Sequence, residues 1–118
     1  ANGLYAIWGT MAYRANSTGD AKFAVTVPSG TTGWWGIQGS DVGTVTNLYS
    51  TRLTAFGDAN TIAIGGGPSD TELIGDFRAY IDTSSTAGNV QIRFAQNTSN
   101  GTASILRTGS FLLGRQLA

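Results

Sequence analysis

The chain has 118 residues and no net charge, because its seven Lys and Arg residues balance its seven Asp and Glu residues. Neutrality predicts no basic surface for nucleic acid or an anionic membrane. The chain contains neither cysteine nor histidine, which excludes disulfides and removes the commonest general base and metal ligand. No apolar run reaches the ~20 residues of a membrane-spanning helix, so we expect no membrane insertion.

The length suits a single domain over residues 1–118 that buries roughly 65% of its unfolded surface. The chain starts at Ala1 without Met and enters a strand almost at once. We therefore expect it to be the C-terminal part of a longer protein, or at least a chain that has lost its initiator Met.

Apolar residues recur with a period of two, and 17 glycines interrupt the chain, so we predict β-strands and no helix. About eight strands are expected, separated by turns. In chain order, the strands are predicted at 4–15, 21–30, 44–56, 61–64 and 71–84, and within 87–118. The segment 31–43 reads as a glycine-punctuated loop. This pattern favours an antiparallel sandwich of two sheets or a jelly roll.

The first strand and the final run are apolar on both faces. In the final run, Phe111 and Leu113 point one way and Leu112 points the other way. A strand in a two-layer sandwich needs only one apolar face, so a second one requires a cover. Another copy of the same chain is the simplest cover, although Leu112 could fit under a loop and Trp8 could stay half exposed. The predicted contact residues are Tyr5, Ile7, Trp8, Met11, Phe111, Leu112 and Leu113.

Trp34 and Trp35 are the candidate ligand-binding residues. An exposed indole ring can stack on the C–H face of a sugar, which would suit contact with a glycan. The alternative is that one ring packs over the open end of the sandwich and the other touches a neighbouring subunit.

The acidic residues give no catalytic or metal-binding pattern. Asp70, Glu72 and Asp76 are predicted to be a solvated strand edge, because their spacing lacks the six to eight oxygen ligands of a calcium site. Asp58 and Asp76 could serve a glycosidase only if they lay roughly 5–9 Å apart, and nothing in the sequence places them so. We expect no enzyme activity, no metal and no cofactor.

Three segments carry a family resemblance: TGDAKFAVTVPSGTTGWWG at 18–36, AGNVQIRFAQNTSN at 87–100 and GSFLLGRQLA at 109–118. Together they resemble bacteriophage virion domains with a tumour-necrosis-factor-like or C1q-like jelly-roll fold. The resemblance implies a homotrimer in which the first and last strands are near neighbours in the sheet that faces the threefold axis.

The resemblance also implies a place on the surface of a phage particle, with other virion proteins as partners. One expected role is the surface knob of a tail fibre or minor tail protein that contacts host carbohydrate through Trp34 and Trp35. The alternative role is a capsid decoration protein that stabilises the phage head. A cellular C1q-like binding module fits less well, because the chain has no cysteine and no visible secretion signal.

Overall fold

The computed structural model describes residues 2–68 and 71–118, and within these ranges it contains nine strands and no helix. The same ranges accordingly hold no helix that could span a membrane. The strands are β1 (Gly3–Arg14), β2 (Ala21–Thr26), β3 (Thr32–Ser40), β4 (Leu48–Leu53), β5 (Ile62–Ile64), β6 (Glu72–Thr83), β7 (Gln91–Gln96), β8 (Ile105–Leu106) and β9 (Phe111–Gln116).

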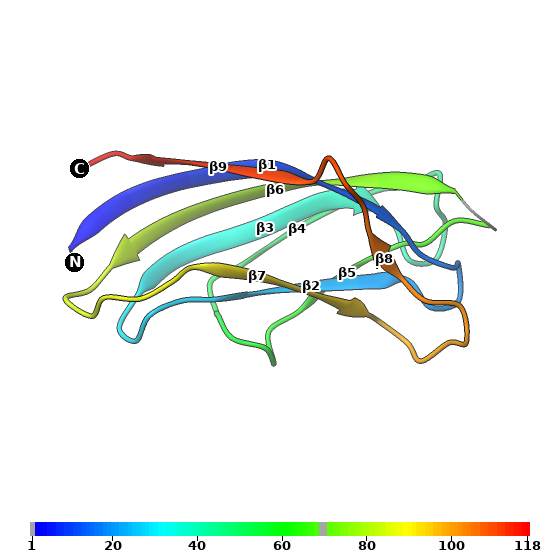
Figure 1. The fold of residues 1–118 in the computed structure, drawn as a ribbon, viewed down its shortest axis with the longest axis horizontal. Coiled ribbons are helices and arrows are strands. Elements are labelled where there is room, and N and C mark those ends of the chain that lie inside the picture. Colours follow the sequence, from blue (N-terminus) through cyan, green and yellow to red (C-terminus); the bar gives the residue numbers. More distant parts are fainter. Residues whose placement is uncertain (1, 69–70) are drawn as a thin grey trace.

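The strands form two antiparallel sheets that lie face to face (Figure 1). The larger sheet has the order β4-β3-β6-β1, and β8 and β9 both pair with the remaining edge of β1. The smaller sheet has the order β5-β2-β7. Most connections pass from one sheet to the other, and β3–β4 is a connection that stays within a sheet. The predicted all-β architecture of two antiparallel sheets is confirmed.

The two longest strands, β1 and β6, form the middle of the larger sheet. They pair along their whole length, from Gly3 opposite Thr83 to Arg14 opposite Glu72. Twelve extended residues span roughly 40 Å, which accounts for most of the 45 Å length of the molecule. In both strands the odd-numbered residues face the smaller sheet and the even-numbered residues face outward.

The core lies between the sheets and is built from these alternating positions. Trp35 is completely buried, and its ring stacks on Phe77 with a centroid separation of 6.3 Å. Its indole Nε1–H donates a hydrogen bond of 3.1 Å to the carbonyl of Ala55, so the ring's polar atom is also satisfied. The other large side chains that are completely or almost completely buried are Tyr13, Phe23, Val25, Ile37, Ile64, Phe77 and Ile81.

Buried polar groups at one end of the core are paired. The Tyr13 hydroxyl donates a 2.6 Å hydrogen bond to the carbonyl of Gly65, and the carboxylate of Asp20 accepts one from the amide of Gly66. Burial, together with the nearby Asp20 charge, raises the pKa of Tyr13 well above its ordinary value. The hydroxyl therefore stays protonated and holds β1 against the segment that follows β5.

The predicted loop at 31–43 is wrong over most of its length, because residues 32–40 form β3. The glycines of this segment do not form a turn; they allow the neighbouring strands to approach β3 closely. Gly33 has a φ of +132°, and a Cβ there would overlap the carbonyl oxygen of Tyr80 on β6. A Cβ on Gly36 would lie 2.5 Å from the carbonyl oxygen of Thr51 on β4. Glycine is thus required by the approach of the neighbouring backbones.

Other predicted boundaries hold to different extents. The strands at 61–64 and 71–84 correspond to β5 and β6, whereas only residues 48–53 of the predicted strand at 44–56 are extended in the sheet. The two-residue β8 was not predicted, because so short a segment carries no periodic signal.

An exposed ion pair fastens the segment between β8 and β9 to the start of β6. Arg107 donates from Nε and Nη2 to the carboxylate of Glu72 at 2.6–3.1 Å. This hydrogen bonding, supported by the positive charges of Arg107 and Arg14, lowers the pKa of Glu72 from its ordinary value of 4.5.

We expect Glu72→Gln to lower the free energy of unfolding at pH 7 and to have no effect well below pH 4. A carboxylate with a lowered folded-state pKa stabilises the fold above its unfolded-state pKa, and this contribution is lost as the pH falls through the folded-state pKa. Urea unfolding of both proteins between pH 2.5 and pH 7 measures the difference. Arg107→Gln should give the same pH profile, and the double variant should add nothing further. A difference between wild type and Glu72→Gln that does not change with pH would contradict the assignment.

Candidate functional site: the edge strand β9 and the outer face of the larger sheet

The C-terminal strand β9 lies at the edge of the larger sheet and is exposed on both of its faces. Phe111, Leu112 and Leu113 are 50%, 44% and 52% exposed. The smaller sheet has three strands and does not reach across to β9, so it leaves the inner face of this strand open. Figure 1 shows β9 beside β1 at the margin of the larger sheet.

The pairing register divides these side chains between the two faces. Leu113 lies opposite Trp8, and Phe111 lies opposite Thr10, so Trp8, Phe111 and Leu113 share the outer face. Leu112 lies opposite Gly9 on the inner face. We call Trp8, Phe111, Leu112 and Leu113 the β9 patch. Leu106 and Leu117, which the sequence analysis did not select, are also about half exposed along this margin.

The remaining predicted contact residues face the inside of the sandwich. Met11 is only 4% exposed and belongs to the core, so it is not available for contact with another chain. Ile7 packs against the core, and Tyr5 is half-buried. The prediction that Met11 contacts another chain is therefore corrected, because its side chain is buried in the core. Tyr5 and Ile7 are accessible only from the inner side of the sheet.

That inner side contains an open groove of about 340 Å³ between β1, β9 and the connection from β6 to β7. Tyr5, Ile7, Pro28, Val90 and Gly114 are among its lining residues. The connection does not cover Leu112, which is 44% exposed, so the alternative that this side chain fits under a loop is not realised. Both faces of β9 thus present apolar surface.

A glycine on β1 makes the pairing with β9 possible. A Cβ on Gly9 would overlap the carbonyl oxygen of Phe111 and lie 2.9 Å from the Cα of Leu112. By contrast, a Cβ on Gly114 of β9 would have no neighbour closer than 3.9 Å. The two glycines therefore form a matched pair for testing this junction.

We expect Gly9→Ala to detach β9 while leaving the rest of the fold in place, because β6 still holds the other edge of β1. Protection of the β9 amides against hydrogen exchange should fall at least about tenfold, which corresponds to a local loss of about 1.4 kcal/mol. Gly114→Ala should keep wild-type protection. Equal protection in the two variants would contradict the close approach at Gly9.

The two adjacent tryptophans lie on opposite faces of β3. Trp35 is in the core, so its predicted role in glycan contact is wrong, because a completely buried ring cannot stack on a ligand. Trp34 is half-buried on the outer face of the larger sheet, opposite Tyr80 of β6. It remains available as a surface contact.

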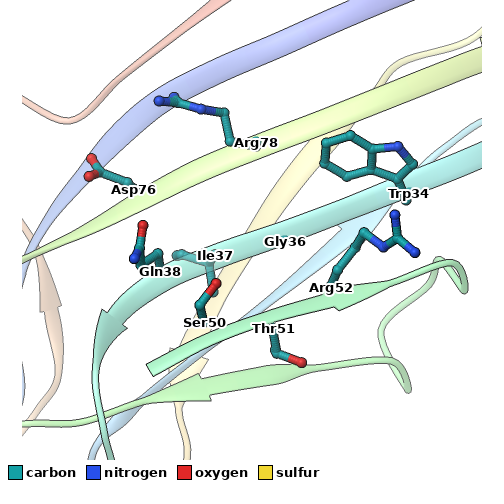
Figure 2. A pocket seen from close by; sticks show the side chains of 9 residues that line it. All are labelled: Trp34, Gly36, Ile37, Gln38, Ser50, Thr51, Arg52, Asp76 and Arg78. Atoms are coloured by element: carbon teal, nitrogen blue, oxygen red, sulfur yellow. The ribbon is translucent and has the colours of Figure 1, made fainter. Parts of the chain in front are cut away.

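Trp34 borders a depression of about 380 Å³ on this outer face, which we call the Gly36 depression. Figure 2 shows side chains from β3, β4 and β6 that project around the bare backbone at Gly36. Arg52 and Arg78 lie directly opposite Gly36 on the two neighbouring strands. Gln38, Ser50 and Asp76 also line the depression.

The depression is lined by two positively charged side chains, Arg52 and Arg78, and by one negatively charged side chain, Asp76. The Arg52 guanidinium lies 5.8 Å from the centroid of the Trp34 ring, a cation–π contact that places the charge at the rim. Within residues 2–68 and 71–118, the ion pairs are Arg93 with Asp58 and Arg107 with Glu72, and neither Arg52 nor Arg78 takes part in one. Asp76 accepts a hydrogen bond of 3.0 Å from the Thr10 hydroxyl.

The acidic residues considered from the sequence do not come together. Glu72 is engaged with Arg107, and Asp70 lies outside the described residues. Asp58 contacts Arg93 of the smaller sheet, whereas Asp76 is on the outer face of the larger sheet. The described ranges contain no group of three or more residues placed to hold a metal ion.

Comparisons with protein-family models, with curated proteins and with solved structures give no match for this chain. The functional argument therefore depends on the chain's own geometry. Two features of the larger sheet carry it: the β9 patch at one margin and the Gly36 depression on the outer face of β3, β4 and β6.

Proposed function

We propose that the chain is a non-enzymatic structural domain on the surface of a phage particle, where it forms a homotrimer through the β9 patch. The observation that carries this proposal is the exposure of β9 on both faces. A strand with large apolar side chains on both faces and an unshared edge favours association with further copies of the same chain.

The energetics of the patch favour association. A fully buried large apolar side chain contributes about 1.5–3 kcal/mol, and the large side chains of β9 are about half exposed in one chain. Covering them in an assembly would recover roughly half of that contribution for each side chain. A closed ring of subunits also covers the edge of β9, which would otherwise be free to pair with any extended segment.

The sheet topology supports the finer proposal of a jelly roll similar to that of the phage domains. The first and last strands pair side by side, as the resemblance implies, and the chain alternates between the two sheets through most of its length. The phage assignment itself depends on the resemblance of the three sequence segments.

Between the two phage roles, the Gly36 depression favours a knob that contacts a ligand over a capsid decoration protein. The depression lies on β3, β4 and β6, and the β9 patch lies on β1 and β9. Arg78 of the depression lies directly opposite Trp8 of the patch, so the two features adjoin at β6 and β1. Gly36 lies on the far side of β6, two strand spacings or roughly 10 Å from β1. The part of the depression over β3 and β4 would therefore remain open when copies associate through the patch.

Sedimentation equilibrium of the purified chain tests the assembly. We expect trimer at micromolar concentration, and a stable monomer there would overturn the proposed assembly. Antibodies raised against the domain test the location, since they should label intact phage particles produced from the genome that encodes the chain. Antibody bound at a few sites on the tail would support the knob, and antibody bound over the whole head would support the decoration protein.

A further inference from the structure

We propose that the Gly36 depression binds an acidic saccharide, that is, a pyranose ring carrying a carboxylate. This inference rests on the proposed role of a ligand-contacting knob and names the ligand class. Three observations carry it: two guanidinium groups that have no ion-pair partner among the described residues, a floor without a side chain between them, and an indole ring at the rim.

The two arginines lie on either side of Gly36, and Figure 2 shows Arg52 extending toward Trp34 and Arg78 extending away from it. Both side chains are exposed, so rotation about their χ angles would bring both guanidinium groups to a carboxylate bound above Gly36. Arg52 and Arg78 flank Gly36 on either side in the strand register, so their Cα atoms are roughly 10 Å apart across two strand spacings. The missing side chain of Gly36 leaves the space between them open. Neither arginine has an ion pair within the part of the chain that the structure describes, and guanidinium groups bind carboxylates through paired N–H donors.

The rest of the lining suits a sugar ring. Trp34 offers an aromatic surface at one end for the C–H groups of a pyranose once the Arg52 guanidinium, which lies 5.8 Å from the ring centroid, turns toward the carboxylate. At the other end, Gln38, Ser50 and Asp76 supply donors and acceptors for hydroxyl groups. The volume of about 380 Å³ falls within the range of roughly 300–1,000 Å³ that is usual for small-ligand sites.

Other ligand classes fit less well. A neutral sugar would offer no opposite charge to either guanidinium group. A nucleic-acid strand needs a longer positive path with several stacking rings, whereas Asp76 and Asp82 bring negative charge to this face and the chain is neutral overall. The local chemistry thus selects one carboxylate together with hydroxyl groups.

The direct test is a titration of the full ¹⁵N-labelled chain with glucuronate, glucose and acetate, followed by NMR. Glucuronate and glucose differ in the carboxylate alone, and acetate supplies the carboxylate without the ring. We expect glucuronate to shift the indole N–H of Trp34 and the Nε–H signals of Arg52 and Arg78. Glucose and acetate should each bind at least about tenfold more weakly.

Single-residue variants test whether glucuronate binds at the Gly36 depression. Arg78→Gln and Trp34→Ala should each weaken glucuronate binding about tenfold or more. The matched control is Arg93→Gln, because Arg93 is an exposed arginine of the smaller sheet and should leave binding unchanged. Arg78 is exposed and Trp34 lies on the outer face, so the variants should keep the dispersed spectrum of the folded chain.

Several results would overturn the inference. Equal binding of glucose would remove the role of the carboxylate, and equal binding of acetate would remove the sugar. Tighter binding of a short single-stranded oligonucleotide would identify a different ligand class. The proposed assembly is judged separately, since a trimer on the particle without glucuronate binding would contradict only this inference, and a monomer that binds glucuronate would contradict only the assembly.

Discussion

Replacing Trp35 with alanine should destabilise the domain by about 3–5 kcal/mol. The ring is completely buried, stacks on Phe77 and donates its N–H to the carbonyl of Ala55. Its removal leaves a large cavity between the sheets and removes the hydrogen bond to the carbonyl of Ala55. A loss of this size is a large part of the about 5–15 kcal/mol that typically stabilises a folded protein. Urea unfolding followed by circular dichroism measures it.

The neighbouring Trp34→Ala is the matched comparison, because it removes the same side chain from the other face of β3. We expect this variant to lower the free energy of unfolding by less than about 1 kcal/mol, since Trp34 lies on the outer face of the sheet and its contact with Arg52 is a surface interaction. Both variants should be measured at one protein concentration, because assembly would add to the apparent stability. Similar losses in the two variants would contradict the alternation of β3.

The sequence predicts the strands well where alternation is regular. In residues 72–83, apolar residues such as Phe77 and Ile81 fall on one face, and the structure buries that face throughout β6. The same reasoning identifies β9 as a strand with two apolar faces. It could not tell which face of β1 is turned inward, because both faces of that strand carry large apolar residues and only the packing against the smaller sheet decides.

The prediction fails where glycine has a tertiary role. The sequence pattern places Gly33 and Gly36 in a loop, but in the structure they allow the backbones of β6 and β4 to approach β3. The same error placed Trp35 on a surface loop. No local signal separates the two uses of glycine, since the need for it comes from strands more than ten residues away in the sequence.

The Gly36 depression was not predictable for a related reason. Gly36, Arg52 and Arg78 come from separate segments, and none of them forms a motif with its sequence neighbours. The registers of β3 with β4 and of β3 with β6 bring them into one row across the sheet. A pairing register depends on the whole core, so this row is a product of the fold and not of a local pattern.

The outer face of the larger sheet therefore has two parts with different chemistry. The part over β1 and β9 carries Trp8, Phe111 and Leu113 of the β9 patch, and the part over β3, β4 and β6 carries arginines, Asp76 and Trp34. This separation of an apolar part from a charged part is consistent with two different contacts on one sheet. The proposed function assigns assembly to the first part and ligand contact to the second.

The sharpest test of that division is Leu113→Asp, which should convert the assembled chain into a folded monomer. Truncating a central interface side chain costs about 2 kcal/mol or more, and the substitution changes all three subunits of the proposed trimer. A total of about 6 kcal/mol raises the trimer dissociation constant by about four orders of magnitude, and the introduced like charges oppose association further. Because Leu113 is 52% exposed in the single chain, the fold itself should tolerate the change.

Leu48→Asp is the matched control, since Leu48 is 73% exposed and lies on β4, at the opposite edge of the same sheet. It introduces the same charge in place of the same side chain, so an unspecific effect of charge would appear in both variants. Sedimentation equilibrium should show monomer for Leu113→Asp and the wild-type assembly for Leu48→Asp. If Leu48→Asp dissociated the assembly and Leu113→Asp did not, copies would associate through β4, and the Gly36 depression would then lie at the interface where no free ligand could reach it.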